Sequence, residues 1–318
     1  MIQNYNFTPL ICAITLLMAS CGGSSGSKII TSPPPSGDGT NNSNGSNGTG
    51  NNILKTLDVR YGPNANNLLD IHQPSNSCTE KRPTVVFAHG GGFVGGDKAA
   101  NRAQTMGPPV LEKGWNFVSI NYRLEEDNAV LSPNYQAIYD DTRPTQPQET
   151  DSIVRTFVAA LEDANTALNF LAANEDAYCM DTSRLAVWGS SAGAYTMLSS
   201  TYLLDNYGIT GPKPDVLIDY WGDLVLDQTL GFMETPFLAL HGDDDPIVPY
   251  QHALDLTARA DEVNVPYSLY TVINGGHGDF DLNTVMIGNK TIMETTIDFI
   301  EAHIVGGVAT YEKVTVSK

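Results

Sequence analysis

The sequence predicts an α/β fold in which a mostly parallel sheet carries helices on both faces. Short apolar runs ended by turn residues recur from Leu54 onward, and continuous apolar character is typical of parallel strands covered on both faces. Helical patterns alternate with these runs, as they do in sheets that lie between layers of helices. The chain has 318 residues, of which 41% are apolar, enough to fill one large core.

The predicted elements lie within residues 53–318. Two early strands, in "LDVRYG" and "NLLDIHQP", form a hairpin-like pair. Five apolar runs and the strand-like "YSLYTV" bring the sheet to about eight strands. The five runs cover 84–92, 116–124, 184–189, 215–222 and 236–242. The predicted helices cover 152–173, 192–204, 250–261 and 291–303.

The N-terminus predicts an exported protein. Phe7 to Met18 is mostly apolar, and about a dozen residues suit the core of a signal peptide but are too few to span a bilayer. This segment ends in "LLMASC", which resembles the lipobox of bacterial lipoproteins, so we expect residues 1–21 to be a signal peptide with lipid added at Cys21. Met18 stands where Leu is usual, and residues 1–10 contain no Lys or Arg. Simple secretion after cleavage near residues 19–21 is therefore the alternative to a membrane anchor.

Residues 22–52 predict a tether. They consist mainly of Gly, Ser, Asn, Thr and Pro, a composition that cannot bury enough apolar surface to fold. The folded domain is expected over 53–318. The net charge of −19 argues against nucleic acid as a partner, because phosphate binding needs clusters of Lys and Arg.

One serine is placed as a nucleophile would be. Ser191 lies in "GSSAG", between the predicted strand 184–189 and the predicted helix 192–204. This is the strand–turn–helix context that the G-x-S-x-G elbow requires. Because the turn is tight, a Cβ atom at 189 or 193 should collide with the neighbouring strand and helix.

A nucleophilic serine needs a base and an orienting acid later in the chain. His277 in "NGGHGDF" follows a predicted strand and should lie at the carboxyl edge of the sheet, where open α/β sheets place their sites. The acid must come from "HGDDDPIVPY", and we expect Asp245, with Asp243 as the alternative. A carboxylate there would hold the imidazole in its working tautomer.

A glycine run predicts an oxyanion hole. "HGGGF" follows the predicted strand that begins at 84, and the N–H groups of Gly91 and Gly92, with that of Ala192, are expected to converge on one point. Each such donor is typically worth about 3 kcal/mol of transition-state stabilisation. A phosphate loop is excluded, because "GGGFVGGDK" lacks the Walker spacing and a following Ser or Thr.

Together these segments resemble an α/β-hydrolase of the HGGG carboxylesterase group, close to bacterial acetyl- and feruloyl-esterase-like enzymes. The resemblance runs from about residue 54 to 303. It rests on "YGPNANNLLDIHQP", "HGGGF", "NYRL", "LEDANTALNFL", "GSSAG", "HGDDDPIVP" and "GGHGDF". It implies hydrolysis of a small ester or an esterified polysaccharide through an acyl-enzyme, with no cofactor and no metal. A serine aminopeptidase or dipeptidyl peptidase, or a non-catalytic binding protein on the same scaffold, is the alternative.

Residues 125–151 are longer than such enzymes usually need. This insertion is polar and rich in proline, and it leaves the carboxyl edge of a strand, so we expect it near the mouth of the site as a partial lid. A surface excursion without function is the alternative. Tyr135 and Tyr139 in the insertion, and Tyr195, are candidate substrate contacts.

The resemblance also implies a disulfide between Cys78 and Cys179. Cys12 leaves with the signal peptide and Cys21 is taken by lipid, so two of the four cysteines remain in an exported domain. In the fold that the chain resembles, the strands after these two cysteines are parallel neighbours, which places both cysteines at the edge opposite the site. Separate buried thiols are the alternative.

Overall fold

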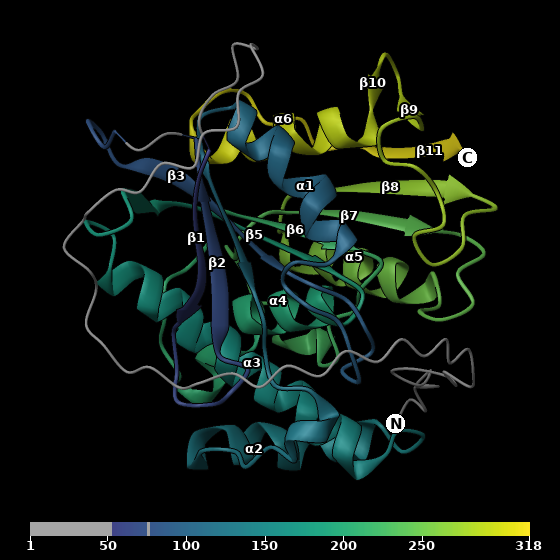
Figure 1. Cartoon of the computed structure of the whole chain (residues 1–318). Helices are drawn as coiled ribbons and strands as arrows, with labels where there is room; N and C mark the ends of the chain where they lie inside the picture. Colours follow the sequence, from purple (N-terminus) through teal and green to yellow (C-terminus); the bar gives the residue numbers. More distant parts are fainter. Residues whose placement is uncertain (1–52, 75–76) are drawn as a thin grey trace, which may run out of the picture.

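A nine-stranded sheet forms the centre of the molecule. The structure is a computed structural model and describes residues 53–74 and 77–318, so the expected signal peptide, Cys21 and the tether 22–52 lie outside the described residues. The strand order is β1-β2-β4-β3-β5-β6-β7-β8-β11, with β1 and β2 antiparallel to their neighbours and the other strands parallel (Figure 1). The strands are β1 Leu54–Arg60, β2 Leu68–Gln73, β3 Arg82–Ala88, β4 Asn116–Ile120, β5 Met180–Ser190, β6 Val216–Tyr220, β7 Phe237–Gly242, β8 Tyr267–Ile273 and β11 Lys313–Ser317.

Helices cover both faces of the sheet, as the sequence predicts. The helices α1 and α6 lie on one face, and α3, α4 and α5 lie on the other (Figure 1). Their bounds are α1 Asn101–Glu112, α2 Pro133–Thr142, α3 Asp151–Ala173, α4 Ala192–Tyr202, α5 Gln251–Val263 and α6 Ile292–Ile304. Short 3-10 turns lie at η1 Glu125–Asp127, η2 Arg143–Thr145, η3 Leu204–Tyr207 and η4 Asp227–Thr229, and a small hairpin pairs β9 Met286–Ile287 with β10 Lys290–Thr291.

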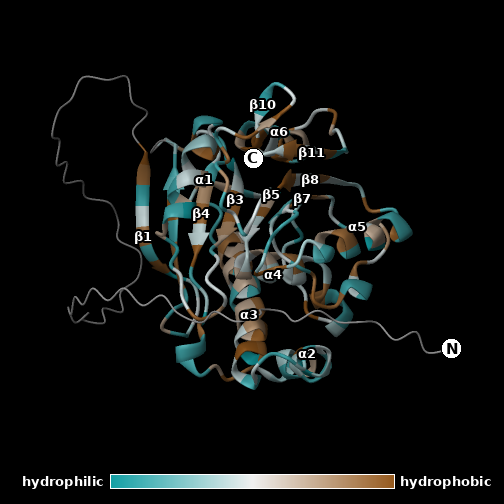
Figure 2. Ribbon diagram, turned by 90° about the vertical axis from the view of Figure 1, so that its right-hand side faces the viewer, coloured by the Kyte–Doolittle hydropathy of each residue, from teal (hydrophilic) through white to brown (hydrophobic). Residues whose placement is uncertain are grey.

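Each face of the sheet has its own apolar core. On one face, α1 and α6 pack against buried residues of the central strands, among them Val85, Trp188 and Leu240. On the other face, α3, α4 and α5 pack against side chains such as Val86 and Leu217. Figure 2 shows apolar strands inside the molecule and hydrophilic residues mainly in the surrounding helices and loops. Neighbouring strand positions point to opposite faces, so the buried central strands contribute side chains to both cores.

The helix α1 and the strand β11 are among the elements that were not predicted. The helix α1 contains Pro108 and Pro109, and proline inside a helix removes backbone donors, so no helix was predicted from the pattern of residues 101–112. It forms because Met106 and Val110 bury against the sheet, where a Cβ at Gly107 would lie 3.0 Å from the ring of Phe117. The strand β11, parallel to β8 at the sheet edge, was also not predicted.

The insertion 125–151 is folded rather than irregular. It contains η1, α2 and η2, and α2 packs on α3, where Ile138 is fully buried. Its first residue is tied to the glycine loop, since the Glu125 N–H donates to the carbonyl oxygen of Phe93 (2.8 Å). In the described part of the chain, no helix has the length and apolar character needed to cross a bilayer.

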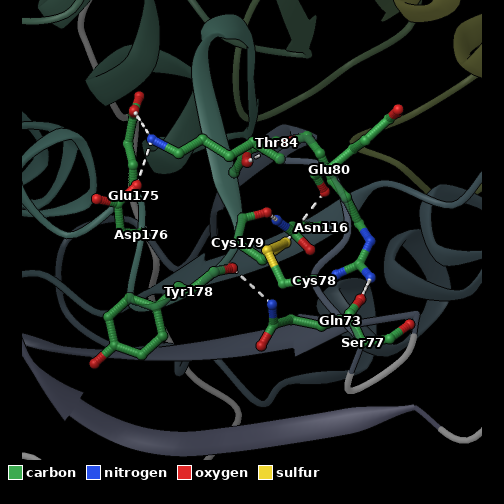
Figure 3. The surroundings of a disulfide bond; sticks show 12 residues. Gln73, Ser77, Cys78, Glu80, Thr84, Asn116, Glu175, Asp176, Tyr178 and Cys179 are labelled. Carbon is green, nitrogen blue, oxygen red and sulfur yellow. Dashed lines mark hydrogen bonds and ion pairs between the residues drawn. A yellow bond between two sulfur atoms is a disulfide. The ribbon is translucent and has the colours of Figure 1, made fainter.

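The disulfide between Cys78 and Cys179 is present (Figure 3). The Cα atoms lie 5.6 Å apart, within the range that a disulfide requires. The strands β3 and β5 are parallel neighbours, and their pairing begins with Arg82 opposite Met180. The expected pairing at the edge opposite the site is therefore confirmed.

Candidate active site

Ser191 lies in a sharp turn between β5 and α4. Its backbone has φ 53° and ψ −127°, a conformation that costs a residue with a side chain roughly 1–3 kcal/mol. A Cβ at Gly189 would lie 2.3 Å from the carbonyl oxygen of Gly193, and one at Gly193 would lie 2.1 Å from that of Ala88. Both glycines are therefore required for the close approach of strand and helix, as the sequence predicts.

The structure brings Ser191, His277 and Asp245 together. The Ser191 Oγ lies 2.8 Å from His277 Nε2, and His277 Nδ1 lies 2.7 Å from Asp245 Oδ2. With the imidazole proton on Nδ1, the ring donates to Asp245 and accepts from the Ser191 hydroxyl. The three residues come from loops at the carboxyl ends of β5, β7 and β8.

The carboxylate of Asp245 is fixed by backbone donors as well as by His277. Its Oδ1 accepts hydrogen bonds from the N–H groups of Ile247 (2.8 Å) and Val248 (2.9 Å), and its side chain is fully buried. Burial alone would raise the pKa of Asp245, but the hydrogen bond and charge of His277 and the two N–H donors lower it below its ordinary value. The group is therefore held ionised beside the imidazole.

Asp243, the alternative acid, has a different contact. Its Oδ1 accepts from the N–H of Asn274 (2.6 Å), and the N–H of the neighbouring Asp244 donates to the carbonyl oxygen of Gly275 (3.0 Å). These bonds join the loop after β7 to the loop that carries His277. Of the two carboxylates considered, Asp245 is the one that contacts the imidazole.

The glycine loop turns beside the serine. Gly91 and Gly92 have φ values of +133° and +61°, and the Gly91 carbonyl oxygen accepts from Val94 and Gly95 (3.1 Å each). A Cβ at Gly90, which sequence reasoning did not single out, would lie 3.0 Å from the Cβ of Ser191. The repeated glycines of "HGGG" are the signal for such close contact. That the N–H groups of Gly91, Gly92 and Ala192 bind an oxyanion stays a prediction.

Ala192, the third predicted oxyanion donor, begins the helix α4 directly after Ser191. It is buried and is the first residue of α4, and the first N–H groups of a helix have no acceptor within that helix. The positive end of the helix dipole adds to the attraction for a negative oxygen. Ala192 follows Ser191 directly, so this donor lies next to the nucleophile.

The three candidate tyrosines are buried within the domain, and that they contact substrate stays a prediction. Tyr135 is buried in the insertion and its hydroxyl accepts from Asn165 Nδ2 (3.1 Å). Tyr139 is buried nearby and hydrogen-bonds through its hydroxyl to Asp151. Tyr195 lies one helical turn after Ser191 and is 1% exposed, so its ring faces the core of the domain.

Two aromatic groups of the site were missed from the sequence. His241, at the end of β7, donates through Nε2 to the carbonyl oxygen of Val248 (2.8 Å) and lies 3.5 Å from Asp245 Oδ2. Burial lowers the pKa of His241 to about 4, so the ring is neutral at pH 7. Trp221, which follows β6 with φ 46°, meets the His277 ring at a centroid distance of 6.2 Å. Its position directly after a strand, in "YWG", was the available signal.

No metal cluster accompanies these residues in the parts of the chain that the structure describes. Within 53–74 and 77–318, no three His, Cys, Asp or Glu side chains are grouped to hold a metal ion.

Comparison with known proteins gives related esterases. The BD-FAE family model matches residues 69–143 and 128–210. Esterase LipC of Mycobacterium tuberculosis is 23% identical over 268 residues, covering 70% of this chain and 59% of that protein. Esterase LipQ of the same organism is 22% identical and covers 77% of this chain and 62% of that protein. The chain thus spans about three fifths of the length of these curated relatives.

Solved structures share the fold at low sequence identity. A truncated carbohydrate esterase from gut microbiota superposes with a TM-score of 0.61 at 17% identity, covering 81% of this chain and 99% of that one. Esterase 2 of Thermogutta terrifontis, with propionate bound, gives a TM-score of 0.58 at 15% identity and covers 81% and 94%. With the strand–turn–helix at Ser191 and the parallel sheet, these similarities show that the chain has the α/β-hydrolase fold, and in sequence it is similar to esterases.

Proposed function

We propose that this protein is a serine carboxylesterase that hydrolyses short-chain acyl or aryl esters through an acyl-enzyme on Ser191. The observation that carries the proposal is the pair of hydrogen bonds that joins Ser191 to His277 and His277 to Asp245, at 2.8 and 2.7 Å. This chain of contacts is the arrangement that activates a serine hydroxyl in acyl transfer.

The proposed mechanism uses the same contacts in acylation and in deacylation. As the Ser191 Oγ attacks the ester carbonyl, His277 Nε2 takes its proton and Asp245 stabilises the imidazolium. The N–H groups of Gly91, Gly92 and Ala192 receive the charge that develops on the carbonyl oxygen. His277 then gives the proton to the leaving alcohol. Water then attacks the acyl carbonyl while His277 Nε2 takes its proton, and His277 returns that proton to the Ser191 Oγ as the bond to the acyl group breaks and the carboxylic acid leaves.

The insertion supports a preference for short acyl groups. It is joined at its start to Phe93 of the glycine loop. Near its end lies Glu149. Burial is the main cause that raises the pKa of Tyr195 on α4, and the charges of Asp223, Asp219, Asp245 and, least, Glu149 add to it. The start of the insertion is therefore bonded to the glycine loop beside Ser191. We infer that the insertion is a fixed partial lid that limits acyl length.

Esterified polysaccharide is the proposed natural substrate class. Two structurally similar proteins bear on it: the carbohydrate esterase from gut microbiota, and a bifunctional protein of Bacteroides eggerthii described as GH43-CE, with a TM-score of 0.57. Acetyl groups on such polymers are short acyl groups, which fits the proposed lid, whereas feruloyl groups are aromatic acyl groups.

We also propose that the protein is an exported lipoprotein anchored through Cys21. The apolar segment before Cys21 and the tether of 22–52 support this. The Cys78–Cys179 disulfide is consistent with it, because such bonds persist in oxidising compartments. Metabolic labelling with a fatty acid that disappears in Cys21→Ala would support the anchor. An unlabelled wild-type protein in the culture medium would favour simple secretion.

The test of the activity combines a variant with a probe. Ser191→Ala should abolish hydrolysis of p-nitrophenyl acetate, and a fluorophosphonate should label Ser191 in the wild type. Ser190→Ala is the matched control, because it removes the neighbouring hydroxyl while leaving the serine that contacts His277. A series of p-nitrophenyl esters should show lower kcat/KM for decanoate than for butyrate. Labelling at Ser190, or full activity in Ser191→Ala, would overturn the assignment.

A further inference from the structure

Arg102, on α1, contacts the loop that carries His277, here called the base loop (residues 274–279). It lies in the first turn of α1, and its Nη2 donates a hydrogen bond to the carbonyl oxygen of Gly278, the residue after His277. Its guanidinium also lies over the Trp221 ring, 5.0 Å from the ring centroid. One side chain thus contacts two neighbours of His277.

Trp221 lies between Arg102 and His277, because its ring contacts both side chains. It is 2% exposed, and its ring meets that of His277 edge to face at 6.2 Å and that of Phe280 at 5.6 Å. Because the indole is enclosed by Arg102, His277 and Phe280, its orientation depends on all three. A guanidinium over an indole is a favourable cation–π pair that strengthens as it is desolvated.

Gly278 shows how tightly these groups fit. It has φ +63°, and an added Cβ would lie 2.6 Å from Trp221 Cζ2 and 2.9 Å from Arg102 Nη2. The backbone directly after His277 is therefore in contact with both side chains. A shift of Arg102 leaves space that the loop can enter.

The other half of the base loop is held separately. Asn274 and Gly275 are hydrogen-bonded to Asp243 and Asp244, in the loop that carries Asp245. At the surface, Asp279 pairs with Lys318. Surface ion pairs contribute little. Gly278 itself receives the charge-assisted bond from Arg102, which is of the stronger class. The contacts of the Arg102 side chain in the described residues are the Gly278 carbonyl oxygen and the Trp221 ring, and the charge of Asp281 also acts on the guanidinium.

We propose that Arg102 is a positioning residue for the esterase reaction, which holds Gly278 and Trp221 so that His277 Nε2 stays within bonding distance of Ser191. This inference rests on the proposed function. The guanidinium acts through the loop backbone and the indole, and takes no proton itself.

The test compares Arg102→Met, which removes both contacts, with Arg102→Lys, which retains the charge. In Arg102→Met, kcat for p-nitrophenyl acetate should fall about 10- to 100-fold, because a misplacement of about 1 Å can cost that much. KM should change by less than about twofold, since the loss concerns the transition state alone. The inflection of the kcat–pH profile should move, and Arg102→Lys should recover part of the rate.

Lys313→Met is the control for loss of a cation–ring contact. Lys313 lies 4.8 Å from the centroid of the Tyr267 ring, at the start of β11 and away from the carboxyl ends of the strands, so this variant should keep the wild-type kcat. Melting temperatures of all variants are measured in parallel. A kcat for Arg102→Met equal to that of Lys313→Met, or an unchanged pH profile, would overturn the proposal.

A readout without substrate separates this proposal from the proposed function. The His277 Nδ1 proton bonded to Asp245 should give a downfield proton NMR signal, assigned by its absence in Asp245→Asn. In Arg102→Met this signal should shift or broaden. If the wild type hydrolyses no ester, the proposed function fails, and an unchanged downfield signal in Arg102→Met would still refute the positioning role.

Discussion

At the scale of single residues, two aspartates in one loop have separate tasks. Asp245 contacts His277, whereas Asp243 accepts from the backbone of Asn274. Asp245→Asn should therefore lower kcat by about 10⁴, because the imidazole then loses its orienting charge and takes the wrong tautomer. Asp243→Asn keeps an oxygen for the Asn274 N–H and should retain most of the activity. Steady-state kinetics on p-nitrophenyl acetate checks this, and the opposite ranking would return the acid role to Asp243.

The sequence predicts the serine and the histidine without an alternative, but it leaves two candidates for the acid. Ser191 has a motif whose glycines are required sterically, and His277 is the histidine in a glycine-rich loop after a strand. The choice between Asp243 and Asp245 depends on which carboxylate receives the N–H groups of Ile247 and Val248. Composition and spacing do not contain that information, because a run of three aspartates is also an ordinary solvated turn.

At the scale of elements, β6 carries a buried acid beneath the serine turn. Asp219 pairs with Gly189 in the sheet, and its Oδ1 accepts from the Gly222 N–H (2.8 Å). Within the described residues its Oδ2 has no hydrogen-bond partner. Burial raises the pKa of Asp219 to about 7. The carboxyl is therefore protonated in the folded protein at a pH where it is ionised in the unfolded chain.

The sign of the pH effect follows from this difference. Between about pH 4 and pH 7 the folded state holds a proton that the unfolded state has lost, so the contribution of Asp219 to stability is full below pH 4 and is lost as pH rises through 7. Asp219→Asn removes this dependence. Its free energy of unfolding relative to the wild type should increase by about 2–3 kcal/mol between pH 5 and pH 8.

Guanidinium unfolding of the wild type and Asp219→Asn at pH 5 and pH 8 measures that change. Asp255→Asn, at an exposed position of α5, is the control and should show no such trend. A difference between wild type and Asp219→Asn that stays constant with pH would contradict the assignment of a raised pKa.

Element prediction succeeded where periodicity was strong and failed where local signals opposed tertiary packing. The helices α3 and α6 begin within one residue of their predicted starts, each after a threonine whose side chain caps the first turn. The helix α1 was missed because its two prolines oppose a helix that the core nevertheless stabilises. The pairing of β11 with β8 joins residues about 45 positions apart, and such contacts leave no local pattern.

At the scale of the whole molecule, the disulfide joins two segments 101 residues apart in the sequence. In the chain-entropy model, closing such a loop contributes about 4–5 kcal/mol at most. The reduced protein, and Cys78→Ser with Cys179→Ser, should therefore unfold at lower guanidinium concentration than the oxidised protein. Alkylation after unfolding without reductant should leave both cysteines unmodified. Equal midpoints for the oxidised and reduced forms would show that the bond adds no stability.

The same bond bears on what happens when the chain is cut. The closed ring runs from Cys78 to Cys179 and includes the glycine loop and the whole insertion, whereas Ser191, Asp245 and His277 all lie beyond it. A protease that cleaves an exposed bond of the insertion produces two pieces, one with the glycine loop and one with the three residues that contact each other at the site. Cys78 belongs to the first piece and Cys179 to the second, so the pieces remain one covalent molecule. If the protein is exported as proposed, proteases can cut it where it cannot be replaced by new synthesis. The disulfide would then keep the glycine loop and the Ser191–His277–Asp245 group in one molecule.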